Sequence, residues 1–151
     1  MSGRHGVGEM SDVLFVCVHN AGRSQMAAAL FNRAASERGL TVRAGSAGTM
    51  PADRVHPNVV ESMRELSIDV SGALPALLTD EIVTRAGKVV TMGCAVDSDA
   101  CPAILLRDVD DWGLPDPKDA PPEAVRTIRD TIAERVGRLL DEWVSASVLS
   151  G

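Results

Sequence analysis

Short hydrophobic or alternating runs along this chain are separated by longer stretches in which hydrophobic residues recur with the period of a helix. The short runs predict strands at residues 12–18, 41–47, 88–92 and 103–107. The longer stretches predict helices at residues 23–38, 56–66, 81–86 and from 121 or 122 to 145. Strands that alternate with helices predict an α/β fold: a single-domain, four-stranded parallel sheet with helices on both faces.

Residues that start or stop helices agree with these boundaries. Thr79 is expected to cap the N-terminus of the third helix, and Gly39 suits the end of the first. The segment 108–122 is polar and rich in proline, so it is predicted to be a long loop. The polar residues 1–11 are predicted to be a disordered tail, which leaves 12–151 as the folded domain.

The first predicted strand leads into a loop that can bind an oxyanion. A loop that passes from a strand into a helix directs backbone N–H groups inward, where the helix dipole adds positive potential. Arg23 can bind two oxygens of the anion, and Cys17 beneath it would be a thiolate nucleophile stabilised by the same N–H groups. The candidate substrate-binding residues of this loop are Val18, His19, Asn20, Ala21, Gly22, Arg23 and Ser24.

Two polar residues are expected to support this loop. Ser24 can hydrogen-bond the Cys17 sulfur and favour its thiolate, and Asn20 can order the loop through side-chain bonds to the backbone. The alternative is that Cys17 is a small buried hydrophobic residue and that Arg23 is a surface residue at the start of a helix.

Composition narrows the classes of function. The 151 residues carry a net charge of −6 without a basic run, which argues against nucleic acid as a partner. No hydrophobic run approaches the ~20 residues that span a bilayer, and the N-terminus lacks a signal-peptide core, so we expect a cytoplasmic protein without a membrane partner. Three cysteines in a reducing compartment indicate reactive thiols or a metal rather than structural disulfides.

The other two cysteines, Cys94 and Cys101, lie in a predicted loop of small and acidic residues. They could be unrelated buried thiols; half of a zinc site is a weaker alternative, because no matching Cys or His pair exists, and no metal is expected. They could also be a resolving pair, in which one thiol attacks an adduct on Cys17 and the second then forms a disulfide with the first. Ligands bind beyond the carboxyl ends of parallel strands, where Cys17, Cys94 and Asp116 should meet.

Asp116 precedes Pro117, and the alternative to a role in the site is that it is only a turn residue.

Several stretches resemble the low-molecular-weight tyrosine phosphatase superfamily, and more closely its arsenate reductase branch of the actinobacterial type. They are the cysteine-x5-arginine-serine loop at 17–24 and the segments 46–49, 89–94 and 112–117. The resemblance implies the fold of these phosphatases and reduction of arsenate to arsenite, a reaction of arsenic resistance and detoxification. Its site residues carried over by position are Cys17 as nucleophile, Cys94 as intermediate thiol, Cys101 as resolving thiol, Arg23 in the anion site and Asp116 as general acid.

The resemblance implies an external thiol reductant and no bound cofactor. The complete set of three cysteines favours an intramolecular thiol–disulfide relay regenerated by thioredoxin. Gly22, which makes the loop similar to that of the mycothiol-coupled branch, favours mycothiol and mycoredoxin instead. Ala28 stands where potassium-binding relatives carry glutamate, so no potassium ion is expected. We expect a monomer.

Two other functions are compatible with the sequence. A low-molecular-weight protein tyrosine phosphatase would use the same loop, but a phosphotyrosine pocket needs aromatic walls and Trp112 is the one plausible wall here. Lys118 follows Pro117 at a position where phosphatases commonly have an aromatic residue. A non-catalytic module for anion binding or redox sensing would keep the loop but would turn over no oxyanion.

Overall fold

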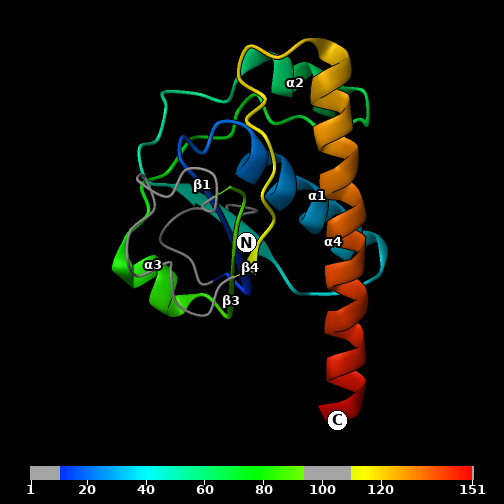
Figure 1. The fold of residues 1–151 in the computed structure, drawn as a ribbon. Coiled ribbons are helices and arrows are strands. Elements are labelled where there is room, and N and C mark those ends of the chain that lie inside the picture. Colours follow the sequence, from blue (N-terminus) through cyan, green and yellow to red (C-terminus); the bar gives the residue numbers. More distant parts are fainter. Residues whose placement is uncertain (1–10, 94–109, 151) are drawn as a thin grey trace.

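The computed structural model describes residues 11–93 and 110–150, which form a parallel sheet with helices on both faces (Figure 1). The sheet is hydrogen-bonded in the order β2-β1-β3-β4, and every pairing is parallel. The strands are β1 (Val13–Cys17), β2 (Ala44–Gly48), β3 (Lys88–Thr91) and β4 (Asp110–Asp111). The helices are α1 (Arg23–Glu37), α2 (Pro57–Arg64), α3 (Asp80–Arg85) and α4 (Pro122–Ser150).

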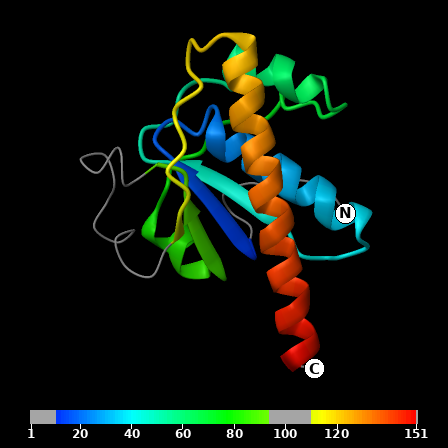
Figure 2. The same cartoon turned by 45° about the vertical axis from the view of Figure 1, so that its right-hand side comes forward.

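Alternate residues of β1 point to opposite faces of the sheet, and each face packs on its own helices. Phe15 belongs to a large cluster that includes residues of α1, α2 and α4, whereas Leu14 packs in a smaller cluster with Ile82 of α3. Figure 2 shows α1 and α4 together on one side of the sheet. Burial on both faces explains the uninterrupted hydrophobic run of β1, and the predicted α/β fold class is confirmed.

Several predicted bounds differ from the structure. β2 begins at Ala44 rather than 41, and α2 ends at Arg64 rather than 66. The strand predicted at 103–107 lies outside the described residues. The structure has β4 at Asp110–Asp111, so the prediction of a continuous loop over 108–122 is wrong for these two residues. Both are exposed and lack a hydrophobic pattern, and their strand character comes from backbone pairing with β3. The last helix extends to Ser150 rather than 145, because residues 146–150 include no glycine or proline.

The two predicted helix caps, Thr79 and Gly39, agree with the structure. Thr79 Oγ1 accepts a hydrogen bond from the Ile82 N–H at 3.2 Å, and Gly39 follows α1 with a φ of +72°. The tail predicted at 1–11 lies outside the described residues except for Ser11. In the part of the chain that the structure describes, no helix has the length and hydrophobicity needed to cross a membrane.

The strand register brings functional segments to one edge of the sheet. Cys17, the last residue of β1, pairs with Gly48, the last residue of β2. After β4 the chain continues alongside the end of β3, where the Leu114 N–H donates to the Met92 carbonyl at 2.7 Å. The segments that follow β1, β3 and β4 therefore meet at the carboxyl edge of the sheet, as the topology rule predicts.

Candidate active site

Cys17 lies beneath the loop that joins β1 to α1, and its sulfur has a polar partner. The sulfur is 2.9 Å from Ser24 Oγ, which is in turn 2.7 Å from Asn20 Nδ2. Because the amide nitrogen of Asn20 can only donate, Ser24 Oγ accepts that bond and its own hydrogen is available to the sulfur. Such a bond stabilises the thiolate, which is the nucleophilic form. Cys17 is buried, but its bond to Ser24 argues against a purely hydrophobic role.

Asn20 holds the loop in shape from inside. It is fully buried and has a φ of +50°, a left-handed conformation that asparagine tolerates better than most residues. Its Oδ1 accepts hydrogen bonds from the Ala76 backbone N–H at 2.9 Å and from Gln25 Nε2 at 3.2 Å. The bond to Ala76 ties the loop to a distant segment, and it is a side-chain-to-backbone bond of the kind expected from the sequence.

Most backbone N–H groups around this loop have no acceptor within the described part of the chain. Residues 18–22, 24 and 25 donate no backbone hydrogen bond there, although most of them are buried. The Met26 N–H donates to the Gly22 carbonyl at 3.0 Å as the first regular bond of α1. Buried N–H groups without acceptors are rare in folded proteins, and at a helix N-terminus they form a site for an anion.

Arg23, the first residue of α1, is held beside this loop by two other segments. Its side chain is buried, and Nη1 donates to the Leu114 carbonyl at 2.7 Å. The Gly93 Cα lies so close that a Cβ there would come within 2.5 Å of the same nitrogen. Neither contact could be predicted from the sequence, because a glycine after a strand and a backbone carbonyl carry no distinctive signal.

The predicted acid, Asp116, lies on a turn that packs against the loop of residues 17–24, the candidate catalytic loop. A Cβ on Gly22 would approach Pro117 Cγ to 2.8 Å and His56 Cδ2 to 3.5 Å, so both side chains cover this glycine. Asp116 Oδ1 accepts the Lys118 backbone N–H at 3.0 Å, and the carboxyl group is exposed. The structure thus places the Asp116 turn against the loop that contains the thiol.

The imidazole ring of His56 lies against Gly22 of the loop. Its backbone N–H donates to the Ala21 carbonyl at 2.9 Å. Burial lowers the pKa of the imidazole below its usual 6.5, Asp116 opposes this shift, and His19 and Lys118 add to it. The lowered pKa favours the neutral imidazole at pH 7. The position of His56 could not be predicted from the sequence, because its contacts come from separate segments.

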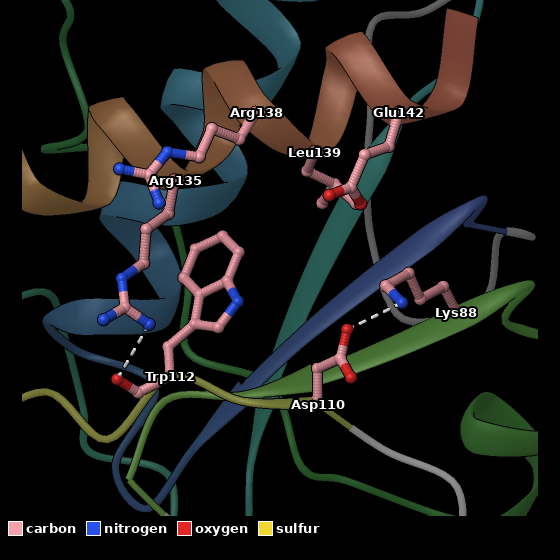
Figure 3. Close-up of a pocket in the computed structure, with 7 residues that line it drawn as sticks. All are labelled: Lys88, Asp110, Trp112, Arg135, Arg138, Leu139 and Glu142. Carbon is pink, nitrogen blue, oxygen red and sulfur yellow. Dashed lines mark hydrogen bonds and ion pairs between the residues drawn. The ribbon is translucent and has the colours of Figure 1, made fainter. Parts of the chain in front are cut away.

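Trp112, the one plausible aromatic wall of a phosphotyrosine pocket, packs against the core and α4 instead. Its ring lies between α4 and the sheet, with its centroid 5.5 Å from that of Phe15 and 6.0 Å from the guanidinium carbon of Arg135 (Figure 3). Arg135 Nη1 also donates to the Trp112 carbonyl at 3.1 Å. Figure 3 shows the ring beside a surface pocket that also contains the Lys88–Asp110 ion pair. Packing against the core fixes the tryptophan in this position.

Two predicted site residues, Cys94 and Cys101, lie outside the described residues. Gly93 directly precedes Cys94 in the sequence and contacts Arg23, so the described chain leads from the anion site toward this cysteine. Among residues 11–93 and 110–150, no cluster of His, Cys, Asp and Glu side chains is arranged to hold a metal ion.

Known proteins share this fold and much of this sequence. The chain is 43% identical to a Halobacterium salinarum protein provisionally named an arsenate reductase, over 85% of this chain and 90% of that protein. It is 36% identical to the structure of a thioredoxin-dependent arsenate reductase of Corynebacterium glutamicum, which it matches with a TM-score of 0.67 over 89% of this chain and 62% of that one. The structure of an arsenate reductase in a phosphate-bound state is 30% identical, with a TM-score of 0.73 over 88% of this chain and 98% of that one.

A sequence model of one protein family spans nearly the whole chain. It is described as low molecular weight phosphotyrosine protein phosphatase, and it matches residues 12–148. The match includes β1, the anion loop and the Asp116 turn, which are the elements that form the candidate site. The chain therefore belongs to the low molecular weight phosphotyrosine protein phosphatase family.

Proposed function

We propose that this protein reduces arsenate to arsenite with Cys17 as the nucleophile. Similarity to proteins named arsenate reductases supports this reaction. The observation that favours it over phosphotyrosine hydrolysis is the position of the aromatic residues. The chain has two Trp, two Phe and no Tyr, and the structure describes all four of them packed in or against the core. An aryl ester would find no aromatic wall here, whereas an inorganic oxyanion needs none.

The anion loop is suited to arsenate, a tetrahedral oxyanion. The N–H groups of residues 18–22, 24 and 25, which have no acceptor in the described part of the chain, can surround the oxygens, and the N-terminus of α1 adds positive potential. Arg23 contributes the guanidinium, which the Leu114 carbonyl orients. Because phosphate has the same shape and charge, it should compete with arsenate for this loop.

The first step joins the Cys17 sulfur to arsenic. As the S–As bond forms, one As–O bond breaks, and the departing hydroxyl takes a proton from Asp116 and leaves as water. Ser24 stabilises the attacking thiolate through its hydrogen bond to the sulfur. A positioned general acid contributes a factor of about 10²–10⁴ to the rate of such a step.

Cys94 and Cys101, both outside the described residues, complete the proposed reduction. The Cys94 thiolate attacks the Cys17 sulfur, so that an S–S bond forms and the S–As bond breaks. The electron pair of the broken bond stays with arsenic, which leaves as arsenite. Cys101 then attacks Cys94, which frees the Cys17 thiolate and leaves a Cys94–Cys101 disulfide. Gly93 lies against Arg23 of the anion loop, and Cys94 is the next residue in the sequence. This supports Cys94 as the first thiol to attack Cys17.

A dithiol protein of the thioredoxin type is the proposed reductant. It would supply two electrons and two protons to the Cys94–Cys101 disulfide, and the protein would need no bound cofactor. The thioredoxin-dependent name of the similar Corynebacterium glutamicum structure supports this choice. Mycothiol with mycoredoxin is the alternative; it would attack the arsenic adduct from outside and would not need Cys101.

The test is arsenate-dependent NADPH oxidation coupled to thioredoxin and thioredoxin reductase, run beside a mycothiol and mycoredoxin system. Turnover with thioredoxin should be lost in both Cys17→Ser and Cys101→Ser. Turnover with mycothiol that persists in Cys101→Ser would show that mycothiol is the reductant, and arsenate reduction would still be the reaction. Hydrolysis of p-nitrophenyl phosphate without arsenate turnover in either system would show that the protein is a phosphatase instead.

A further inference from the structure

We propose that Asn58 is a positioning residue that holds the turn carrying Asp116 against the catalytic loop. We call residues 115–120 the acid turn. The inference rests on the proposed function, since it takes Asp116 as the acid of that reaction. Its basis is a set of contacts that join the first turn of α2 to the acid turn.

The acid turn contacts the catalytic loop through one buried residue. Pro117 is buried and lies over Gly22, where a Cβ would approach Pro117 Cγ to 2.8 Å. Asp116 is directly before Pro117, and its Oδ1 accepts the Lys118 N–H at 3.0 Å. The position of Pro117 therefore determines how far the Asp116 carboxyl group lies from an anion bound above Cys17.

Asn58 supplies the hydrogen bonds that connect the acid turn to another helix. Its Nδ2 donates to the Pro117 carbonyl at 2.8 Å and to the Ala120 carbonyl at 3.3 Å. Both partners are acceptors, which fixes the orientation of the amide. Among the described residues, no other element donates a hydrogen bond to residues 115–120, and the remaining bonds of the turn are internal to it.

The acid turn needs an external support. Most of its residues are exposed, including Asp116, and Asp119 has a φ of +60°, a left-handed conformation that costs energy for a residue other than glycine. An exposed turn with a strained residue has few packing contacts to hold it in one position. The two bonds from Asn58 meet this need.

The helix that carries Asn58 is fixed firmly enough to serve as that support. Val59 and Met63 of α2 are fully buried, and the His56 N–H donates to the Ala21 carbonyl in the catalytic loop at 2.9 Å. At the other end of α2, the buried Arg129 of α4 donates to the Ser62 carbonyl at 2.7 Å. The first turn of α2 therefore touches the catalytic loop and the acid turn together.

The test compares Asn58→Asp, Asn58→Ala and a control, Glu61→Gln, with the unaltered full chain. Asn58→Asp has the same shape but cannot donate to the two carbonyls. A carboxylate in the first turn of α2 also favours the helix dipole, so this variant should fold. We expect both Asn58 variants to lower kcat/KM for arsenate about tenfold or more, because misplacing a catalytic group by about 1 Å can cost ~10²-fold. Inhibition by phosphate should be unchanged in both, because Asn58 does not belong to the anion loop. Glu61→Gln should match the unaltered chain.

A double variant distinguishes positioning from general damage. If Asn58 acts through Asp116, Asn58→Asp should cause no further loss when Asp116 is already changed to Asn, whereas independent effects would multiply. The inference is overturned if Asn58→Asp retains full kcat/KM, if phosphate binding falls in parallel, or if the two losses multiply. It is also overturned if Asp116→Asn retains full activity, although arsenate reduction itself would then stand. Absence of arsenate turnover in the unaltered chain would instead refute the proposed function.

Discussion

Replacing Gly93 by alanine should weaken anion binding by displacing Arg23. The new Cβ would lie 2.5 Å from Arg23 Nη1, whereas ordinary contacts between such atoms are about 3.5 Å or longer. The guanidinium must therefore move by about 1 Å, and this movement strains or breaks its 2.7 Å bond to the Leu114 carbonyl. The atom displaced is the end of a flexible side chain, so the fold should tolerate the change while the anion site does not.

The magnitude follows from the bonds that Arg23 makes to the anion. A hydrogen bond to a charged group contributes about 1.5–3 kcal/mol, and 1.4 kcal/mol corresponds to a factor of ten in affinity. Gly93→Ala should therefore raise the dissociation constant for phosphate roughly 10- to 150-fold. Phosphate binding, measured by titration calorimetry, is the appropriate assay because it requires no turnover and so does not depend on the neighbouring Cys94.

A matched control is available on α4. A Cβ on Gly137 would meet no atom within 4 Å, so Gly137→Ala should leave phosphate binding unchanged. Because alanine is the better helix former, this control should also raise the melting temperature slightly. Unchanged phosphate affinity in Gly93→Ala would refute the claim that the Arg23 guanidinium, in the position seen here, binds the anion.

Two further predictions concern the thiol and the packing of α2 on α4. Ser24→Ala removes the hydroxyl that lies 2.9 Å from the Cys17 sulfur. Iodoacetamide should therefore alkylate Cys17 at pH 7 at least about tenfold more slowly. An unchanged rate would show that Ser24 does not stabilise the thiolate. Hydrogen bonds from Arg126 and then Arg129 lower the pKa of Glu65 from 4.5 to about 2, so the stability that they provide is present above pH 4.5 and is lost as the pH falls through about 2. Glu65→Gln should therefore lower the melting temperature at pH 7 and have progressively less effect toward pH 2; a constant difference across this range would contradict the assignment.

The region from β1 to α1 could be predicted because several independent signals agree there. The hydrophobic run, the loop from Cys17 to Ser24 and the strong helix formers after it all indicate a strand, an anion loop and a helix. The α/β class followed from the alternation of such elements, and the carboxyl-edge rule predicts from the sequence that Asp116 lies near Cys17.

Other features depend on contacts that no local pattern reveals. β4 consists of two exposed aspartates, and their strand conformation arises from pairing with β3. Gly93 and Asn58 contact residues far away in the sequence, so their importance appears once the chain is folded. Trp112 was the one plausible aromatic wall for a phosphotyrosine pocket, and the sequence does not reveal to which side of the sheet a residue near a strand end will pack.

The most direct test of the central claim is a single turnover of arsenate by the reduced protein without any external reductant. Arsenite released is quantified, and the thiols are then mapped by mass spectrometry. We expect one arsenite per chain, a disulfide between Cys94 and Cys101 with Cys17 free, and no arsenite from Cys17→Ser. Equal arsenite release from Cys17→Ser, or none from the unaltered chain, would contradict the central claim.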